Sequence, residues 1–204
     1  MAVKRAVFLD KDGTLIPDIP FNVNTSLITL SDHAIEGLRL LQRLGYLIIV
    51  ITNQPGIAKG LFSHAQVLAT GDKIKSLLKR QGVELSGYYY CPHSPSFFKS
   101  WIGLSCTCRK PLPGLLHRAA RELNIELNIS WMVGDILHDV EAGNLAGCRT
   151  ILINNGNETE WLVNDSRTPD AIVPHINGAA EYILDMNLQR INYENNTPAL
   201  YQHF

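Results

Sequence analysis

The chain has 204 residues, of which 46% are hydrophobic, and its formal net charge is −1 at pH 7. This length suits one domain, and the apolar content is enough for a buried core, which excludes a disordered chain. The near-neutral charge argues against broad electrostatic binding to nucleic acid or to an anionic membrane. No apolar run reaches the length of a membrane span, and the first residues lead directly into an apolar segment, so we expect a cytoplasmic protein without a signal peptide.

Apolar runs alternate with segments of helical periodicity along the chain. We expect short buried strands over residues 6–10, 47–51, 88–90, 131–134, 150–153 and 171–173. We expect a helix capped by Ser31 or Asp32 and closed by Gly45, and further helices over about 63–81, 113–123, 138–145 and 176–188. Strands separated by helices indicate an α/β fold with a parallel, doubly wound sheet.

Two carboxylates follow the first strand, since Asp10 and Asp12 stand just before the turn-forming Gly13. Open α/β sheets bind ligands at the carboxyl ends of their strands. One carboxylate there could attack an electrophile, while the second exchanges protons with the leaving group and then with water. An ordinary Asp-Gly turn explains the same residues without any chemistry.

Polar residues follow two other expected strands. The run Thr52-Asn53-Gln54 could seat an oxyanion or a phosphate, or it could be a simple turn into the next helix. Asp135 suits Mg²⁺, with Asp139 orienting the waters of the metal, or it could cap the helix that follows.

A basic pair precedes two prolines that restrict the backbone. Lys110 held beside the carboxylates would offset their repulsion, and Arg109 could bind a carboxylate or a phosphate through two hydrogen bonds. The alternative is a solvated pair of surface cations.

Three cysteines and a histidine form the most specific remaining pattern. Cys91 and His93 are separated by twelve residues from Cys106 and Cys108. Three thiols and an imidazole make a closed tetrahedral Zn²⁺ site, which is structural because no position is open for a substrate. The alternatives are four unrelated residues or a disulfide between Cys106 and Cys108, which would be strained at that spacing. Cys148 stands apart and is expected in the core.

Taken together and in order, the four polar motifs resemble those of the haloacid dehalogenase (HAD) superfamily of phosphatases. The resemblance implies a Rossmann-like sheet, Mg²⁺ and an aspartyl-phosphate intermediate. It implies a nucleophile, a general acid/base, a phosphate-binding hydroxyl and a stabilising cation, which are Asp10, Asp12, Thr52 and Lys110 respectively. The implied Mg²⁺ ligands are Asp10, Asp135 and the backbone carbonyl of Asp12.

The cysteine pattern followed by Arg-Lys-Pro resembles the phosphatases that act on heptose 1,7-bisphosphate or on histidinol phosphate. The long spacer and the run 52–60 are similar to the heptose group, although Pro55, Lys59 and Ile136 depart from its pattern. This resemblance implies a small phosphorylated sugar as substrate. The expected binding residues are Asn53, Gln54, Lys59 and Arg109.

We therefore expect a monomer with one domain over 1–190, a zinc loop at 91–108, no large cap domain and a loosely held tail over 191–204. The alternatives are a phosphatase of histidinol phosphate, another sugar phosphate or a nucleic-acid 3′-phosphate, and a catalytically idle binding module on the same fold. Release of phosphate from a generic aryl ester would separate the enzymes from the binding module.

Overall fold

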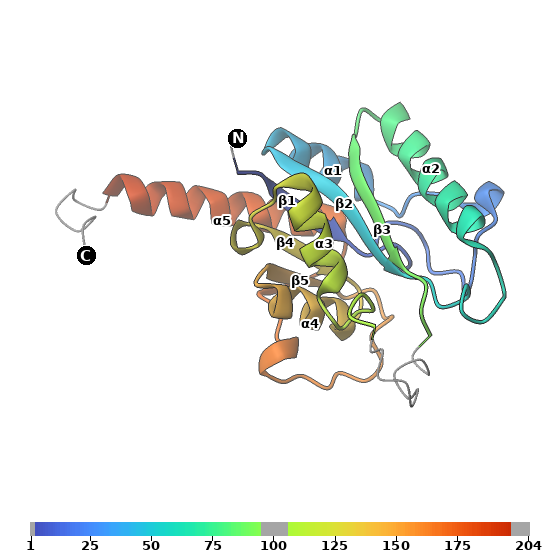
Figure 1. Cartoon of the computed structure of the whole chain (residues 1–204). Helices are drawn as coiled ribbons and strands as arrows, with labels where there is room; N and C mark the ends of the chain where they lie inside the picture. The colour runs from blue at the N-terminus through green and yellow to red at the C-terminus, as the bar shows by residue number, and fades with distance from the viewer. Residues whose placement is uncertain (1–2, 95–105, 197–204) are drawn as a thin grey trace.

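A computed structural model describes residues 3–94 and 106–196, which contain one six-stranded sheet with parallel neighbours throughout (Figure 1). Its strands are β1 (Arg5–Leu9), β2 (Tyr46–Asn53), β3 (Leu85–Cys91), β4 (Trp131–Gly134), β5 (Arg149–Ile153) and β6 (Ala171–Val173). They lie in the order β3-β2-β1-β4-β5-β6. The predicted doubly wound α/β fold is confirmed, and β3 is longer than the sequence predicts.

Helices cover both faces of this sheet. They are α1 (Ala34–Arg43), α2 (His64–Arg80), α3 (Gly114–Leu123), α4 (Leu137–Ala146) and α5 (Ile176–Asn196), with short 3₁₀ turns η1 (Thr25–Leu27), η3 (Leu127–Ile129) and η4 (Asp165–Arg167). Helices α1 and α5 pack against each other on one face, and α3 and α4 lie on the other (Figure 1).

The alternation of side chains along β1 divides the core into two layers. Val7 and Leu9 pack in the layer of α1 and α5, while Ala6 and Phe8 pack in the layer of α3. All four side chains are completely buried. A strand that is apolar at every position is typical of a parallel sheet buried on both faces, because each side chain then meets a helix layer.

The two predicted helix caps have different outcomes. Ser63 caps α2 through a capping box with Gln66, as predicted. The predicted cap of α1 is wrong, because α1 begins after His33, which has a left-handed backbone (φ 57°) and makes no side-chain cap. Ser31 contributes its backbone carbonyl instead, which accepts a hydrogen bond from the Ala34 amide.

Helix α5 runs on to Asn196, into the segment expected to be a loosely held tail. Leu188 and Ile191 remain about half exposed there (49% and 48%), so this part of the helix has no apolar stripe facing a core. Figure 1 shows α5 projecting past the sheet. Residues 197–204 of the predicted tail lie outside the described residues.

The chain between β2 and β3 forms α2 and its connections, and within the described residues it forms no separate cap domain. The zinc loop is described only at its two ends, since residues 95–105 lie outside the described part of the chain. No helix in the described ranges is both long and apolar enough to cross a bilayer.

Candidate active site and metal centres

The order of the strands reverses at β1 and β4, which is where open α/β sheets form their ligand crevice. Asp10 follows β1 and Asp135 follows β4, and the Asp10 amide donates to the Val133 carbonyl. The two carboxylates and that of Asp139 offer oxygens within 4.8 Å of one another. The fold therefore brings together acids that are far apart in the sequence.

The ammonium of Lys110 lies among these acids. Its Nζ is 2.5 Å from Asp10 Oδ1 and 2.5 Å from Asp139 Oδ1, and it donates to the Ile51 carbonyl at 3.0 Å. Burial works against the charged amine, but the two carboxylates outweigh it, so the pKa of Lys110 lies above its ordinary value. Lys110 is therefore a permanent cation beside the predicted nucleophile.

Asn53 holds the loop that carries Lys110. Its Nδ2 donates to the Lys110 carbonyl and its Oδ1 accepts from the Lys110 amide, both at 3.1 Å. This reciprocal pair joins the end of β2 to the Lys110–Pro111 peptide, which is cis. A role of Asn53 in binding substrate stays a prediction.

Asp12 lies on the loop after β1, and both of its oxygens accept hydrogen bonds. Lys11 Nζ is 2.7 Å from Oδ1, and Gln54 Nε2 is 3.1 Å from Oδ2. Gln54 also donates to the Thr52 hydroxyl at 3.0 Å. Burial raises the pKa of Asp12, and the Lys11 ammonium opposes that shift. A raised pKa suits a group that must both give and accept a proton.

Asp135 is held by Thr14 of the first motif and by Asn157, which the sequence motifs did not single out. Thr14 Oγ1 donates to its Oδ1 at 2.9 Å and Asn157 Nδ2 to its Oδ2 at 2.6 Å, while Asn155 Nδ2 donates to the Gly13 carbonyl at 2.6 Å. Burial and the charge of Asp10 raise the pKa of Asp135 to about 6. The two asparagines follow β5, so the same strand-end pattern that revealed the acids could have found them.

This acid group fits a Mg²⁺ ion. The carboxylate oxygens of Asp10, Asp135 and Asp139 lie within 4.8 Å of one another, and burial together with the charge of Asp10 raises the pKa of Asp135, both of which a divalent cation would relieve. Asp139 differs from the expectation in its contacts, because its Oδ1 pairs with Lys110 and its Oδ2 accepts from the Ile136 amide at 3.3 Å. Its predicted contact with waters of the metal stays a prediction.

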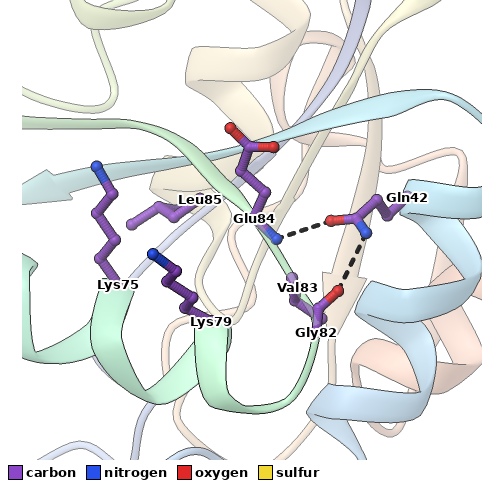
Figure 2. A pocket seen from close by; sticks show the side chains of 7 residues that line it. All are labelled: Gln42, Lys75, Lys79, Gly82, Val83, Glu84 and Leu85. Atoms are coloured by element: carbon purple, nitrogen blue, oxygen red, sulfur yellow. Dashed lines mark hydrogen bonds between the residues drawn. The ribbon is translucent and has the colours of Figure 1, made fainter.

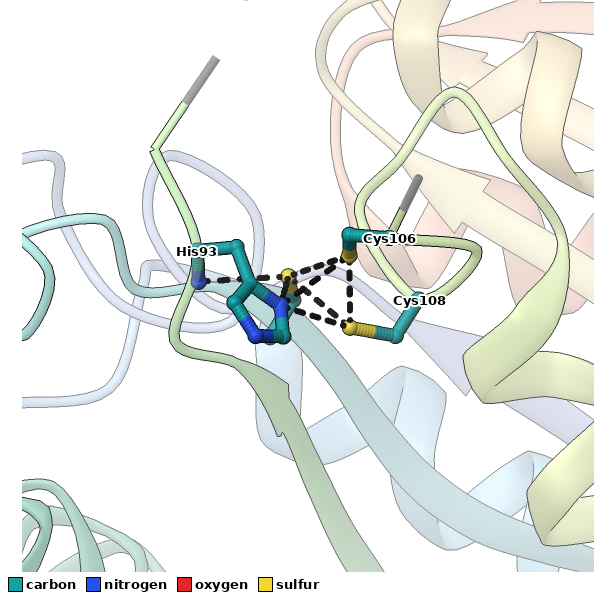
Figure 3. Close-up of side chains that lie close together, drawn as sticks. His93, Cys106 and Cys108 are labelled. Carbon is teal, nitrogen blue, oxygen red and sulfur yellow. Dashed lines mark hydrogen bonds between the residues drawn. The ribbon is translucent and has the colours of Figure 1, made fainter. Parts of the chain in front are cut away.

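The three thiols and the imidazole of the second motif face one another at the end of β3 and ahead of α3 (Figure 3). His93 Nδ1 lies 3.5, 3.0 and 3.3 Å from Cys91, Cys106 and Cys108. Cys106 and Cys108 are free thiols with their sulfurs 3.0 Å apart, whereas a disulfide bond measures about 2.05 Å. The structure thus has no disulfide between Cys106 and Cys108, and the four donors fit a closed Zn²⁺ site. Cys148 is buried in the core, as expected.

The two cations expected to bind substrate, Arg109 and Lys59, contact groups outside the acid cluster. Arg109 Nη1 donates to the His93 carbonyl at 3.2 Å, which ties the thiol cluster to the residue beside Lys110. The ammonium of Lys59 lies 4.7 Å from the centre of the Phe21 ring. Their contacts with substrate stay predictions.

One cavity lies next to the acids, and another lies away from them. One of about 370 Å³ is bordered by Gly13, Asn155 and Asn157, next to Asp135. Another of about 440 Å³ lies beside the amino end of β3, whereas the acids follow the carboxyl ends of β1 and β4 (Figure 2). There Gln42 of α1 contacts the turn between α2 and β3. Its side-chain amide donates to the Gly82 carbonyl and accepts from the Glu84 amide. This second cavity holds none of the predicted catalytic residues.

Comparison with known proteins agrees with this geometry. Residues 107–179 match the HAD-hydrolase-like family. A D-glycero-β-D-manno-heptose-1,7-bisphosphate 7-phosphatase from Pasteurella multocida is 43% identical over 155 residues, which are 76% of this chain and 84% of that protein. The enzyme of the same name from Haemophilus influenzae is 37% identical over 93% of this chain and 97% of its own length.

A solved structure of D,D-heptose 1,7-bisphosphate phosphatase from B. bronchiseptica, complexed with magnesium and phosphate, has a TM-score of 0.72. It is 28% identical and covers 89% of this chain and 99% of its own. With the HAD motifs assembled at the switch point, the chain is a phosphatase of the HAD type and belongs to the family of the D-glycero-β-D-manno-heptose-1,7-bisphosphate 7-phosphatases.

Proposed function

We propose that this chain removes the 7-phosphate of D-glycero-D-manno-heptose 1,7-bisphosphate in a Mg²⁺-dependent reaction. The observation that carries the proposal is the convergence of Asp10, Asp135 and Lys110 at the switch point of a chain that belongs to this family. A carboxylate nucleophile next to a fixed cation suits attack on a phosphate ester.

In the first half of the reaction, a carboxylate oxygen of Asp10 attacks phosphorus in line with the leaving sugar oxygen. Asp12 gives its proton to that oxygen as the bond to phosphorus breaks, which leaves a phosphoryl group on Asp10. The Thr52 hydroxyl and the Lys110 ammonium bind the phosphoryl oxygens. Mg²⁺ held by Asp10, Asp135 and the backbone carbonyl of Asp12 would supply further positive charge there.

In the second half, Asp12 accepts a proton from a water molecule that attacks the phosphoryl group. The bond between Asp10 and phosphorus breaks, and inorganic phosphate is the product. Asp12 thus ends the cycle with the proton that it donated at the start, so the reaction balances without another proton source.

The thiol cluster takes no part in the reaction but supports the loop that carries Lys110. Zn²⁺ held by Cys91, His93, Cys106 and Cys108 would supply a structural cross-link and would leave no position for substrate. Cys108 immediately precedes Arg109 and Lys110, so the cluster restrains the loop that positions the catalytic cation.

The second phosphate of the substrate is expected to contribute binding energy that orients the first. Lys59 and Arg109 are the proposed cations for it. Asn53 and Gln54, at the carboxyl end of β2, contact Lys110 and Asp12 respectively. The sugar bisphosphate should therefore be a much better substrate than the corresponding monophosphate.

A turnover assay with heptose bisphosphate, heptose monophosphate and histidinol phosphate tests this proposal. We expect the highest kcat/KM for the bisphosphate, and Lys59→Ala should raise the KM for it while aryl phosphates are hydrolysed as before. Lys75 is an exposed lysine of α2 beside the cavity at the amino end of β3, so Lys75→Ala is the matched control. It should change neither the KM for the bisphosphate nor the rate with aryl phosphates. Equal efficiency on mono- and bisphosphate, or a preference for histidinol phosphate, would remove the heptose assignment.

The nucleophile is tested separately. Asp10→Asn keeps the size of the side chain but removes the attacking charge, and loss of a nucleophile costs on the order of 10⁴-fold or more in kcat. Asp12→Asn should instead slow turnover by about 10²- to 10⁴-fold, the usual contribution of general acid–base catalysis. Near-normal phosphate release by Asp10→Asn would contradict covalent catalysis.

A further inference from the structure

Lys11 is a buried cation that the proposed mechanism does not use. It stands between Asp10 and Asp12, yet its side chain is only 1% exposed. Removing an ammonium from water is unfavourable unless it is paired. Within the described residues, the recorded partner of its Nζ is Asp12 Oδ1, at 2.7 Å. The burial of Lys11 is therefore linked to the position of Asp12.

The backbone of Lys11 also fixes the loop. Its carbonyl accepts hydrogen bonds from the amides of Leu15 at 3.1 Å and Ile16 at 2.9 Å. The Gly13 amide donates to the Ile16 carbonyl at 2.8 Å, which tightens the same turn. Because these bonds involve only backbone atoms, replacement of the Lys11 side chain leaves them in place and isolates the effect of the ammonium.

The two oxygens of Asp12 have unequal partners. Oδ1 pairs with the Lys11 ammonium, and Oδ2 accepts from the neutral amide of Gln54. Both hydrogen bonds involve the carboxylate charge, but only the bond to Lys11 joins opposite charges, so Oδ1 is held more strongly than Oδ2. Gln54 also donates to the Thr52 hydroxyl, so Oδ2 is aligned with the proposed phosphate seat. Lys11 thus holds Oδ1 of Asp12, while Oδ2 lies on the side of the proposed phosphate site.

We propose that Lys11 is a positioning residue, which orients Asp12 so that Oδ2 is the oxygen that exchanges the proton. The inference rests on the proposed function, in which Asp12 is the general acid and base. The proton leaves Oδ2 for the sugar oxygen as the ester bond breaks, and a proton from the attacking water returns to Oδ2. Lys11 itself contacts Asp12 and takes no part in bond making.

Pre-steady-state hydrolysis of 4-nitrophenyl phosphate with Mg²⁺ tests this role in the full chain. Lys11→Met keeps the aliphatic stem and removes the charge. Formation of the intermediate should survive, because a good leaving group needs little acid, so we expect a burst of nitrophenolate near one equivalent per chain. The steady-state rate after the burst should fall at least about tenfold, since hydrolysis of the intermediate needs a well-placed base.

Two further variants separate positioning from general stability. Lys11→Arg restores a cation and should bring the steady-state rate most of the way back to that of the natural chain. Lys11→Met combined with Asp12→Asn should be no slower than Asp12→Asn alone, because the lysine has no carboxylate left to orient. Thr70→Val, which removes a buried hydroxyl on α2, is the control and should leave burst and steady-state rate unchanged.

The outcomes decide between the alternatives. A steady-state rate of Lys11→Met within about twofold of the natural chain overturns the proposal. Equal loss of burst and steady-state rate, with no recovery in Lys11→Arg, shows that Lys11 is only structural and also overturns it. If Lys11→Met fails to fold, Lys11→Arg carries the test, and a folded Lys11→Arg whose steady-state rate is lower than that of the natural chain by about tenfold or more gives the same negative answer. Failure of the proposed function is recognised independently, when Asp10→Asn remains active.

Discussion

At position 13 the active site has no room for a side chain. Gly13 has a positive φ of 84°, and a Cβ there would lie 2.1 Å from Asp135 Oδ2 and 2.4 Å from Asn157 Nδ2. Gly13→Ala should therefore displace Asp135 and weaken the binding of Mg²⁺ by about 10- to 100-fold, as changes in the residues around a metal site do. The measurement is the Mg²⁺ concentration that gives half-maximal phosphate release. Gly45→Ala is the matched control, because Gly45 has a similar φ of 82° with nothing within 4 Å, and it should leave this concentration unchanged. If Gly13→Ala needs the same Mg²⁺ concentration as the natural chain, the proposed role of Asp135 as a Mg²⁺ ligand is contradicted.

At the scale of elements, the thiol cluster joins the end of β3 to the start of α3. Cys91 closes β3, whereas Cys106 and Cys108 precede α3. We expect about one tightly bound Zn²⁺ per chain, and metal binding then forms part of the folding free energy. Cys106→Ser should lower zinc content and melting temperature, and it should also lower kcat through the loop that carries Lys110. Cys148→Ser, a buried thiol apart from the cluster, should keep its zinc. Reduced, unchelated protein without zinc would show that the closed site is misassigned.

At the scale of the whole molecule, the buried acids make stability depend on pH and Mg²⁺. Burial and Asp10 raise the pKa of Asp135 from its ordinary 3.8 to about 6 in the folded chain. The protonated form therefore favours folding, and this contribution is present below about pH 4 and lost as pH rises to about 6. Since Mg²⁺ needs the ionised carboxylate, we expect it to raise the melting temperature more at pH 8 than at pH 5. A ligand at a hundred times its Kd stabilises by about 2.7 kcal/mol. Thermal unfolding with and without Mg²⁺ at the two pH values measures this, and an equal shift at both would contradict it.

The ends of helices can be predicted where the residues that fix them are close together in the sequence. The Ser63 cap is confirmed because its capping box lies within four residues of sequence. The start of α1 cannot be predicted in this way. His33 precedes the helix with a φ of 57°, and a histidine side chain does not indicate that conformation. The sequence does not predict the end of α5, because the exposed residues after Leu188 have no apolar periodicity.

The sheet and the places of its polar motifs could be predicted from the sequence alone. Buried parallel strands are apolar at every position, so β1, β2 and β4 could be recognised from short runs, and the acids stand where those runs end. Their meeting at one point followed from the strand order, which brings β1 and β4 side by side.

The side chains that hold the acids and Lys110 in place become known only from the folded structure. Lys11 pairs with Asp12, Asn53 holds the backbone of Lys110, and Asn157 donates to Asp135 across 22 positions of sequence. A position after a strand can place such a residue near the acids, as for Asn53 and Asn157, but its residue type does not show which atom it contacts. Burial is what gives such contacts their strength, because a charge removed from water must find a partner, and burial is a property of the assembled fold.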